Sequence, residues 1–263
     1  MPCECIKVLS NLGAERNEED HASVMCASPN TVIFLNDKLE QRFAHAAGAL
    51  SSTDPAPRTA VEITYNSGCE NLLRIPESIG KLVAPQSLII TNNKLVALPE
   101  SVGQPVALQK LELASNNLAT LPESICQLLA LRTCHLTGNK LATLPKSIDQ
   151  LVALERLSLG FNGFANLPEG IGHLVALQDV DLSLNRLARL PESIGELAVL
   201  QKLLLNCNKL TALPDSLSQL KALQKLILNG NEFTTLPARI GQLVALRYFD
   251  ADDNLLTTLP ESI

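Results

Sequence analysis

The sequence contains very few aromatic residues. Only 3% of its 263 residues are aromatic, with no tryptophan and two tyrosines, although 46% are hydrophobic. A single thick core is normally filled in part by aromatic rings. The scarcity of rings therefore predicts a thin core, filled mainly by leucine and repeated along one axis.

An excess of basic residues and any long apolar run are also missing. The 21 Lys and Arg residues are outnumbered by 27 Asp and Glu, which gives a net charge of −6. Nucleic-acid-binding surfaces are basic, and a membrane span needs roughly 18 consecutive apolar residues. We therefore expect neither a nucleic-acid partner nor a membrane span.

The features of an exported protein are missing as well. The N-terminus, MPCECIKVLSNLG, has no apolar core of a secretory signal and no Gly at position 2, so we expect neither a signal peptide nor a myristoylation site. The seven cysteines are an odd number at irregular spacing, and no Asn-x-Ser/Thr acceptor occurs. These features predict a reducing, cytoplasmic location, with acylation of Cys3 or Cys5 left open as an alternative.

Motifs for catalysis are absent. The sequence has no Walker loop, no Gly-x-Ser-x-Gly elbow, no His-Glu-x-x-His and no kinase signature. Cys3, Cys5, His21 and Cys26 could be imagined as a zinc site, but their spacing matches no strong pattern. We therefore predict no enzyme activity, no cofactor and no bound metal.

What the sequence does have is a repeat of 23 residues. Proline recurs at this step at positions 76, 99, 122, 145, 168, 191, 214, 237 and 260. Asparagine recurs at positions 93, 116, 139, 162, 185, 208, 231 and 254. One unit, Leu108 to Ala130, reads LQKLELASNNLATLPESICQLLA, which fits the pattern LxxLxLxxNxLxxLPxSIxxLxx. Such a period is typical of a solenoid.

Each part of the unit has a physical reading. Leu111 and Leu113 alternate with Glu112, which predicts a short strand with one buried face, stacked in parallel on the next strand at about 4.8 Å. Asn116 ends the strand, where its amide can bind backbone groups at the turn. The following proline suits an irregular or 3₁₀ return segment. Consensus core positions are filled by Phe164, Phe233 and Phe249, and a buried strand position by Cys134.

The motif resembles that of the leucine-rich repeat family over residues 58–263, about nine repeats. The LPxSIGxL half resembles the intracellular 23-residue class found in Ras-pathway scaffold proteins and their plant relatives, and it also resembles bacterial repeats. The resemblance implies an α/β solenoid, a curved horseshoe with a parallel β-sheet on its concave face and 3₁₀ or irregular segments on its convex face.

The two ends of the chain depart from the repeat. Residues 1–57 do not repeat; the acidic stretch near residues 11–20 predicts disorder, and the apolar spacing over 31–50 predicts a helix that caps the solenoid. A separate partner-binding helix is the alternative. At the other end the sequence stops within a repeat at Ile263. Because a solenoid needs a polar cap, we expect either a truncated chain, which we favour, or a partner or self-association that covers that end.

Candidate binding residues lie in the variable columns of the repeat. Apolar residues that the repeat does not require fall on adjacent units in two such columns: Leu204 and Ile227 between the strand leucines, and Phe161, Leu184 and Cys207 before the repeated asparagine. His135 lies in the first of these columns. A contiguous exposed apolar patch predicts a protein-binding site.

Charged residues are also arranged by column. Arg156, Lys202 and Lys225 form, with Lys110, a basic row beside the patch. A second basic row follows the asparagine, at Lys94, Lys140, Arg186 and Lys209. Glutamates follow the proline at positions 77, 100, 123, 169, 192 and 261 and predict an acidic convex edge. These charges either keep the surface soluble or steer an acidic partner onto the patch.

The sequence therefore predicts a non-catalytic interaction scaffold that binds protein on its concave face. The resemblance to Ras-pathway scaffolds implies partners such as small GTPases or other signalling proteins, whereas the phosphatase-docking signal is incomplete, because Asn30 and Thr31 precede Val32-Ile33-Phe34. Two alternatives stay open: the recognition part of a larger enzyme, such as a ligase, kinase or GTPase, and a bacterial repeat protein delivered to host cells. The oligomeric state is not indicated.

Overall fold

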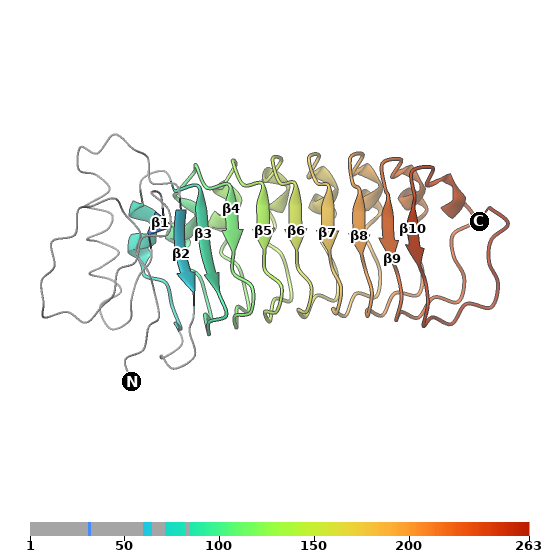
Figure 1. Cartoon of the computed structure of the whole chain (residues 1–263), viewed down its shortest axis with the longest axis horizontal. Coiled ribbons are helices and arrows are strands. Elements are labelled where there is room, and N and C mark those ends of the chain that lie inside the picture. Colours follow the sequence, from blue (N-terminus) through green and yellow to red (C-terminus); the bar gives the residue numbers. More distant parts are fainter. Residues whose placement is uncertain (1–30, 33–59, 65–71, 83–84, 263) are drawn as a thin grey trace, which may run out of the picture.

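The fold is a solenoid built around one parallel sheet (Figure 1). A computed structural model describes residues 31–32, 60–64, 72–82 and 85–262. Ten strands lie in the sheet in chain order. They are β1 Thr31–Val32, β2 Ala60–Thr64, β3 Ser87–Thr91, β4 Lys110–Glu112, β5 Thr133–His135, β6 Arg156–Ser158, β7 Asp179–Asp181, β8 Lys202–Leu204, β9 Lys225–Ile227 and β10 Tyr248–Asp250. The predicted solenoid with one parallel sheet is confirmed.

The sheet register follows the sequence period. From β3 to β10, the strand residues that pair do so with the residue 23 positions later; Leu157, for example, pairs with Val180. Equivalent residues of successive repeats therefore form straight rows across the sheet, about 4.8 Å apart. Each column of equivalent positions in the sequence repeat therefore corresponds to a row of neighbouring residues in the structure.

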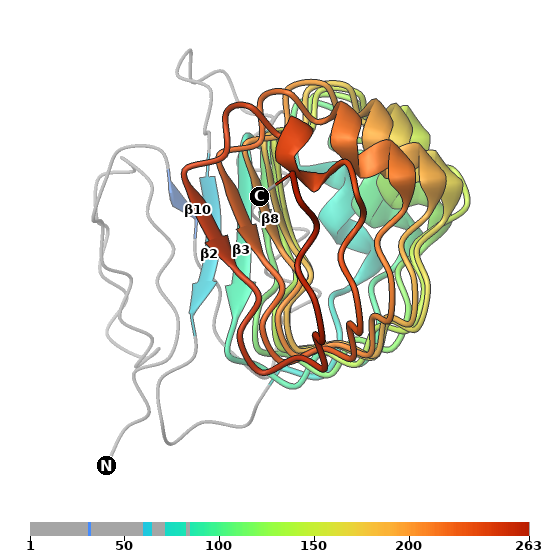
Figure 2. The ribbon, with the colours of Figure 1, turned by 90° about the vertical axis from the view of Figure 1, so that its right-hand side faces the viewer.

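Short 3₁₀ helices lie across the core from the sheet (Figure 2). They are η1 Glu77–Lys81, η2 Glu100–Gly103, η3 Glu123–Gln127, η4 Ile148–Gln150, η5 Glu169–His173, η6 Glu192–Glu196, η7 Asp215–Gln219 and η8 Ile240–Gln242. In most of them the repeated proline is the N-cap, and its carbonyl accepts the first bond of the turn, as from Ile125 N to Pro122 O at 3.2 Å. Proline suits this position because its φ is fixed and it has no N–H to lose.

The core between sheet and helices is one repeat thick. Leu111 and Leu113 are fully buried, and so are Phe164 and Phe233, as predicted. Phe249, predicted to be equally buried, is only half-buried, because it lies in the last described repeat with a neighbour on one side. Cys134 is buried as predicted, and loss of solvation raises its pKa to about 12. Its thiol therefore stays protonated and unreactive at neutral pH.

The repeated asparagines form an internal ladder that joins successive repeats. In Asn116 the side-chain oxygen accepts a bond from Leu95 N at 3.1 Å. Its amide donates to Ile90 O at 2.8 Å and to Leu113 O at 3.0 Å. Leu95 and Ile90 belong to the preceding repeat, so one side chain satisfies backbone groups of two repeats. The structural role predicted for this column is confirmed.

The N-terminal end differs from the expectation at one place. Thr31 and Val32, the first residues of the predicted capping helix, form strand β1, which pairs with Ala60 and Val61 of β2. Residues 33–50 lie outside the described residues, so a helix there stays a prediction. The cysteines and histidine considered for a zinc site lie outside them as well.

Candidate binding surface

The central row of the sheet holds the predicted residues, but it is less exposed than predicted. His135, Ser158, Asp181, Leu204 and Ile227 succeed one another in the strand register. Leu204 is half-buried, and Ile227 is only 9% exposed. In this row Ile227 lies between Leu204 and Asp250. The prediction that Ile227 lies on an exposed patch is therefore wrong. His135 is also half-buried and lies in the same row, three repeats before Leu204.

The residues before the repeated asparagines form a second row, at the edge of the sheet. Phe161 is 63% exposed, Leu184 is 48% exposed and Cys207 is exposed too. These three residues, in three consecutive repeats, are called here the edge row. They are the most exposed apolar part of the predicted patch.

Every residue of this column has a left-handed backbone. The φ angle is 53° at Phe161, 53° at Leu184 and 55° at Cys207. In this conformation each backbone N–H donates to the following repeat, as from Phe161 to Ser183 O at 2.8 Å and from Leu184 to Asn206 O at 2.9 Å. The other members are Asn92, Ser115, Gly138, Gly230 and Asp253. Small or Asx residues tolerate this region, whereas a bulky residue there is an outlier.

The cations of the first basic row interact with other side chains of the protein. Arg156 Nε lies 3.7 Å and Lys202 Nζ 3.3 Å from the same Asp179 Oδ2. Lys225 Nζ lies 4.9 Å from the ring centroid of Tyr248. Sequence reasoning placed the cations correctly but overlooked Asp179 and Tyr248, which stand in the same row. These side chains are half-exposed, so the pairs contribute little stability, but they reduce the charge offered to a partner.

The cations of the second basic row form no ion pairs with the residues that the structure describes. Lys94, Lys140, Arg186 and Lys209 are all exposed. Within residues 72–82 and 85–262 no carboxylate lies within 4.0 Å of any of them. Arg186 follows Leu184 by two residues, and Lys209 follows Cys207 by two residues. Unpaired positive charge therefore lies beside the edge row, on the side away from the strands.

The glutamates after the proline have a structural role that the sequence did not reveal. Glu123 Oε1 accepts a bond from Lys146 N at 2.9 Å, and Glu169 Oε2 accepts one from Ser193 N at 3.2 Å. Each bond joins one return segment to the next. The bonds from the Lys146 and Ser147 backbone lower the pKa of Glu123. The predicted acidic edge is therefore partly an inter-repeat hydrogen-bond ladder.

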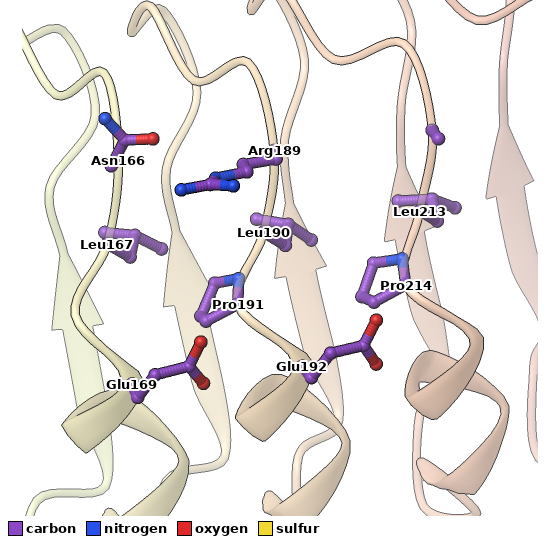
Figure 3. Close-up of a pocket in the computed structure, with 10 residues that line it drawn as sticks. Asn166, Leu167, Glu169, Arg189, Leu190, Pro191, Glu192, Leu213 and Pro214 are labelled. Carbon is purple, nitrogen blue, oxygen red and sulfur yellow. The ribbon is translucent and has the colours of Figure 1, made fainter.

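A hollow of about 410 Å³ lies between three return segments (Figure 3). Leu167, Leu190 and Leu213 form its apolar lining, with Arg189 and the carboxylates of Glu169 and Glu192 at its side. The two glutamates come from equivalent positions in adjacent repeats and lie side by side rather than facing a common point (Figure 3). General acid–base catalysis needs groups that converge on one reacting atom, and this arrangement does not supply them.

Neither a metal cluster nor a membrane-spanning helix is found in the part of the chain that the structure describes. No group of three or more His, Cys, Asp or Glu side chains there could hold a metal ion. The helices of those residues are too short and too polar to cross a bilayer.

Comparison with known proteins agrees with this geometry. Residues 107–164 match the family described as leucine rich repeat, and residues 169–259 match that described as leucine-rich repeat region. Among curated proteins none matches the chain.

Solved structures are similar over most of the solenoid. A leucine-rich repeat protein of Leptospira interrogans is 36% identical with a TM-score of 0.73, over 78% of this chain and 51% of that one. The ectodomain of the Arabidopsis thaliana receptor kinase GASSHO1/SCHENGEN3, in complex with Casparian strip integrity factor 2, is 32% identical with a TM-score of 0.66, over 76% and 24%. The plant peptide hormone receptor RGFR1 in complex with RGF2 is 27% identical with a TM-score of 0.60, over 78% and 38%. The chain thus spans about half the length of the first of these relatives.

Proposed function

Because the chain belongs to the leucine-rich repeat family, we propose that it is a non-catalytic interaction module that binds a protein partner on the concave side of its sheet. The observation that carries this proposal is apolar surface on three consecutive repeats, exposed at Phe161 and Leu184 and half-buried at Leu204. Apolar surface in this arrangement is not required by the repeat and is typical of protein-binding sites.

The rigid ladder of strands and asparagines supports this mode of action. A surface whose backbone is already ordered loses little conformational entropy when a partner docks. The two plant structures, determined in complex with Casparian strip integrity factor 2 and with RGF2, support a peptide or protein as the class of partner. A cytoplasmic location and a role in signalling, with a small GTPase among the partners, remain part of the proposal on the strength of the sequence motif.

The proposal is tested by a substitution within the sheet and a matched one outside it. Leu204→Asp places a charge on the half-buried concave surface, whereas Val175→Asp changes an exposed residue on the return side. We expect Leu204→Asp to remove partners that co-purify with the wild type, measured by quantitative mass spectrometry, while Val175→Asp retains them. Loss from both variants, or from neither, with unchanged circular dichroism, would contradict binding on the sheet.

A second candidate is the recognition part of a larger enzyme. The likeness to the ectodomain of a receptor kinase, of which this chain spans 24%, favours it. Sequencing of the complete transcript distinguishes the two: a catalytic domain in the same reading frame supports the second candidate, and its absence from the reading frame supports the first.

A further inference from the structure

We infer that the edge row, together with Arg186 and Lys209, is a docking ridge for an acidic polypeptide segment that carries apolar side chains. This inference rests on the proposed function and narrows the main contact to the edge row, with Leu204 on the sheet left outside it. It also changes which cations recognise the partner, from Arg156, Lys202 and Lys225 to the second basic row.

Backbone conformation is the first argument. Phe161 and Leu184 hold left-handed φ angles, a region that is sterically unfavourable for a bulky L-residue. The same column carries Gly138 and Gly230, so the repeat accepts the residue that adopts this conformation without strain. Strain retained at consecutive, exposed positions points to a role outside the fold.

A second exposed apolar row, on the return side, serves as a comparison for the edge row because the repeat pattern itself explains it. Val106, Leu129, Val152 and Val175 are 51–65% exposed on the return side of four consecutive repeats. Their column is apolar in nearly every repeat, and none of them has a positive φ. The repeat pattern therefore accounts for this row. It accounts neither for Phe161 nor for Leu184.

Charge complementarity indicates the chemistry of the partner. Arg186 and Lys209, each two residues from an edge-row member, have no carboxylate within 4.0 Å in the described part of the chain. On the strand side, Asp181 is the nearest acidic residue to Leu184 in the sequence, and its Oδ1 already accepts bonds from the Ser183 N–H and hydroxyl at 2.9 and 2.6 Å. A segment with apolar side chains on the edge row and carboxylates toward Arg186 and Lys209 pairs the unpaired charges.

Asparagine substitution separates binding from folding. Asn tolerates the left-handed region, so Phe161→Asn with Leu184→Asn removes the apolar surface while it relieves the backbone strain. We expect a melting temperature equal to or above that of the wild type. Phe161→Gly, which also relieves the strain, serves as a second variant. The control is the Val152→Asn and Val175→Asn pair, which removes similar surface from the return side.

The probe is a displayed library of random 12-residue peptides, selected on the immobilised full-length chain. We expect the enriched peptides to combine Asp or Glu with Leu, Ile or Phe. As fluorescein-labelled synthetic peptides they should bind the Phe161→Asn/Leu184→Asn variant at least about tenfold more weakly than the wild type, and the control pair equally well, by fluorescence anisotropy. Arg186→Glu should weaken binding and reduce its salt dependence, whereas Lys94→Glu, in the same column four repeats earlier, should not.

Several outcomes would overturn the inference. They are an empty selection, enrichment of basic or uncharged peptides, equal binding by the edge-row variant, and loss of binding in the control pair. Binding to phosphatidylserine–phosphatidylcholine vesicles that Arg186→Glu abolishes, without peptide enrichment, would point to a membrane surface instead. If Leu204→Asp removes co-purifying partners while the edge-row variant does not, the proposed function stands and the ridge is wrong. If neither variant has an effect, both fail.

Discussion

At the scale of the residue, the asparagine side chain does more for this fold than its size suggests. Asn116, Asn139, Asn185, Asn208 and Asn231 are each less than a tenth exposed. Each accepts one backbone bond from the preceding repeat and donates at least two, as Asn231 does to Leu205 O at 2.9 Å and Leu228 O at 2.8 Å. Buried backbone groups need such partners because water cannot reach them.

The neighbouring residues Asn116 and Asn117 offer a matched test of this role. Asn116→Leu leaves the backbone groups of Leu95, Ile90 and Leu113 without their partners. We expect it to lower the free energy of unfolding by about 2–4 kcal/mol, because each unpaired buried group costs about 1–3 kcal/mol. The measurement is urea denaturation followed by circular dichroism.

Asn117→Leu is the control, because its side chain lies outside the ladder and only its backbone bonds, to Leu95 O at 2.9 Å. It should change the free energy of unfolding by less than about 0.5 kcal/mol. Equal losses from the two variants would mean that the asparagine ladder is not what holds adjacent repeats together.

At the scale of the element, several of the described 3₁₀ helices are joined to the next return segment through the glutamate at their first position. Each helix has five residues or fewer, too short to be stable alone. In some of the described helices the first glutamate accepts a backbone bond from the next return segment: Glu77 from Ser101 N at 3.3 Å, Glu123 from Lys146 N and Glu169 from Ser193 N. The return side therefore has a hydrogen-bond ladder of its own.

This ladder makes stability depend on acidity at Glu123. Its backbone bonds lower its pKa from the ordinary 4.5, so its stabilising effect is present above about pH 4.5 and is lost as the pH falls through the lowered value. We expect Glu123→Gln to lower the melting temperature near pH 7, with a difference from the wild type that shrinks below pH 4.5. Thermal unfolding between pH 3 and pH 7 measures this.

Glu100→Gln is the matched control, because Glu100 also begins a helix but accepts no such bond within the described residues. Its difference from the wild type should not vary with pH over the same range. A pH-independent effect of Glu123→Gln would show that the carboxylate bonds do not stabilise the fold.

At the scale of the whole molecule, contacts join each repeat mainly to its two neighbours. Among the elements that the structure describes, the main contacts of each strand are with the strands before and after it, and those of each helix with the helices before and after it. Stability is then a sum of repeats and the interfaces between them. In the last described repeat Leu246, Phe249 and Leu256 are half-buried, whereas their equivalents Leu223, Leu226 and Phe233 are fully buried.

Local opening should follow this difference in burial. We expect backbone amides of residues 245–259 to exchange hydrogen for deuterium faster than those of residues 153–213, which lie between two intact neighbours. Hydrogen exchange read by mass spectrometry at pH 7 measures the rates on the wild-type chain. Uniform exchange across both ranges would instead show that the solenoid opens as one cooperative unit.

The candidate site could be predicted only in part. The rows follow from the period of 23, and the alternation of Leu111, Glu112 and Leu113 identifies which residues face outward. The burial of Ile227 depends on the neighbours of its side chain in the row. The ion pairs that Arg156 and Lys202 each form with Asp179 depend on how far these side chains reach. These are properties of side-chain conformation, which the spacing of residues does not carry.

The backbone conformation of the edge row could be predicted from the sequence at some positions of its column but not at others. Its column of Asn92, Ser115, Gly138, Gly230 and Asp253 contains the residue types that tolerate positive φ, so the sequence held a signal for it. That signal was hidden at Phe161, Leu184 and Cys207, where bulkier residues occupy the same backbone position. At these three positions the backbone N–H still donates to the following repeat, so the conformation follows the repeat rather than the residue type.

By itself the sequence determined the solenoid, its register, its leucine core and the asparagine ladder, because an unbroken repeat lets each unit pack only on an identical neighbour. Only the tertiary structure decided which surface residues are exposed, which cations are already paired and which backbone positions are strained. The physical reason is that these properties arise between side chains of adjacent repeats, where size, reach and charge of particular neighbours decide the outcome.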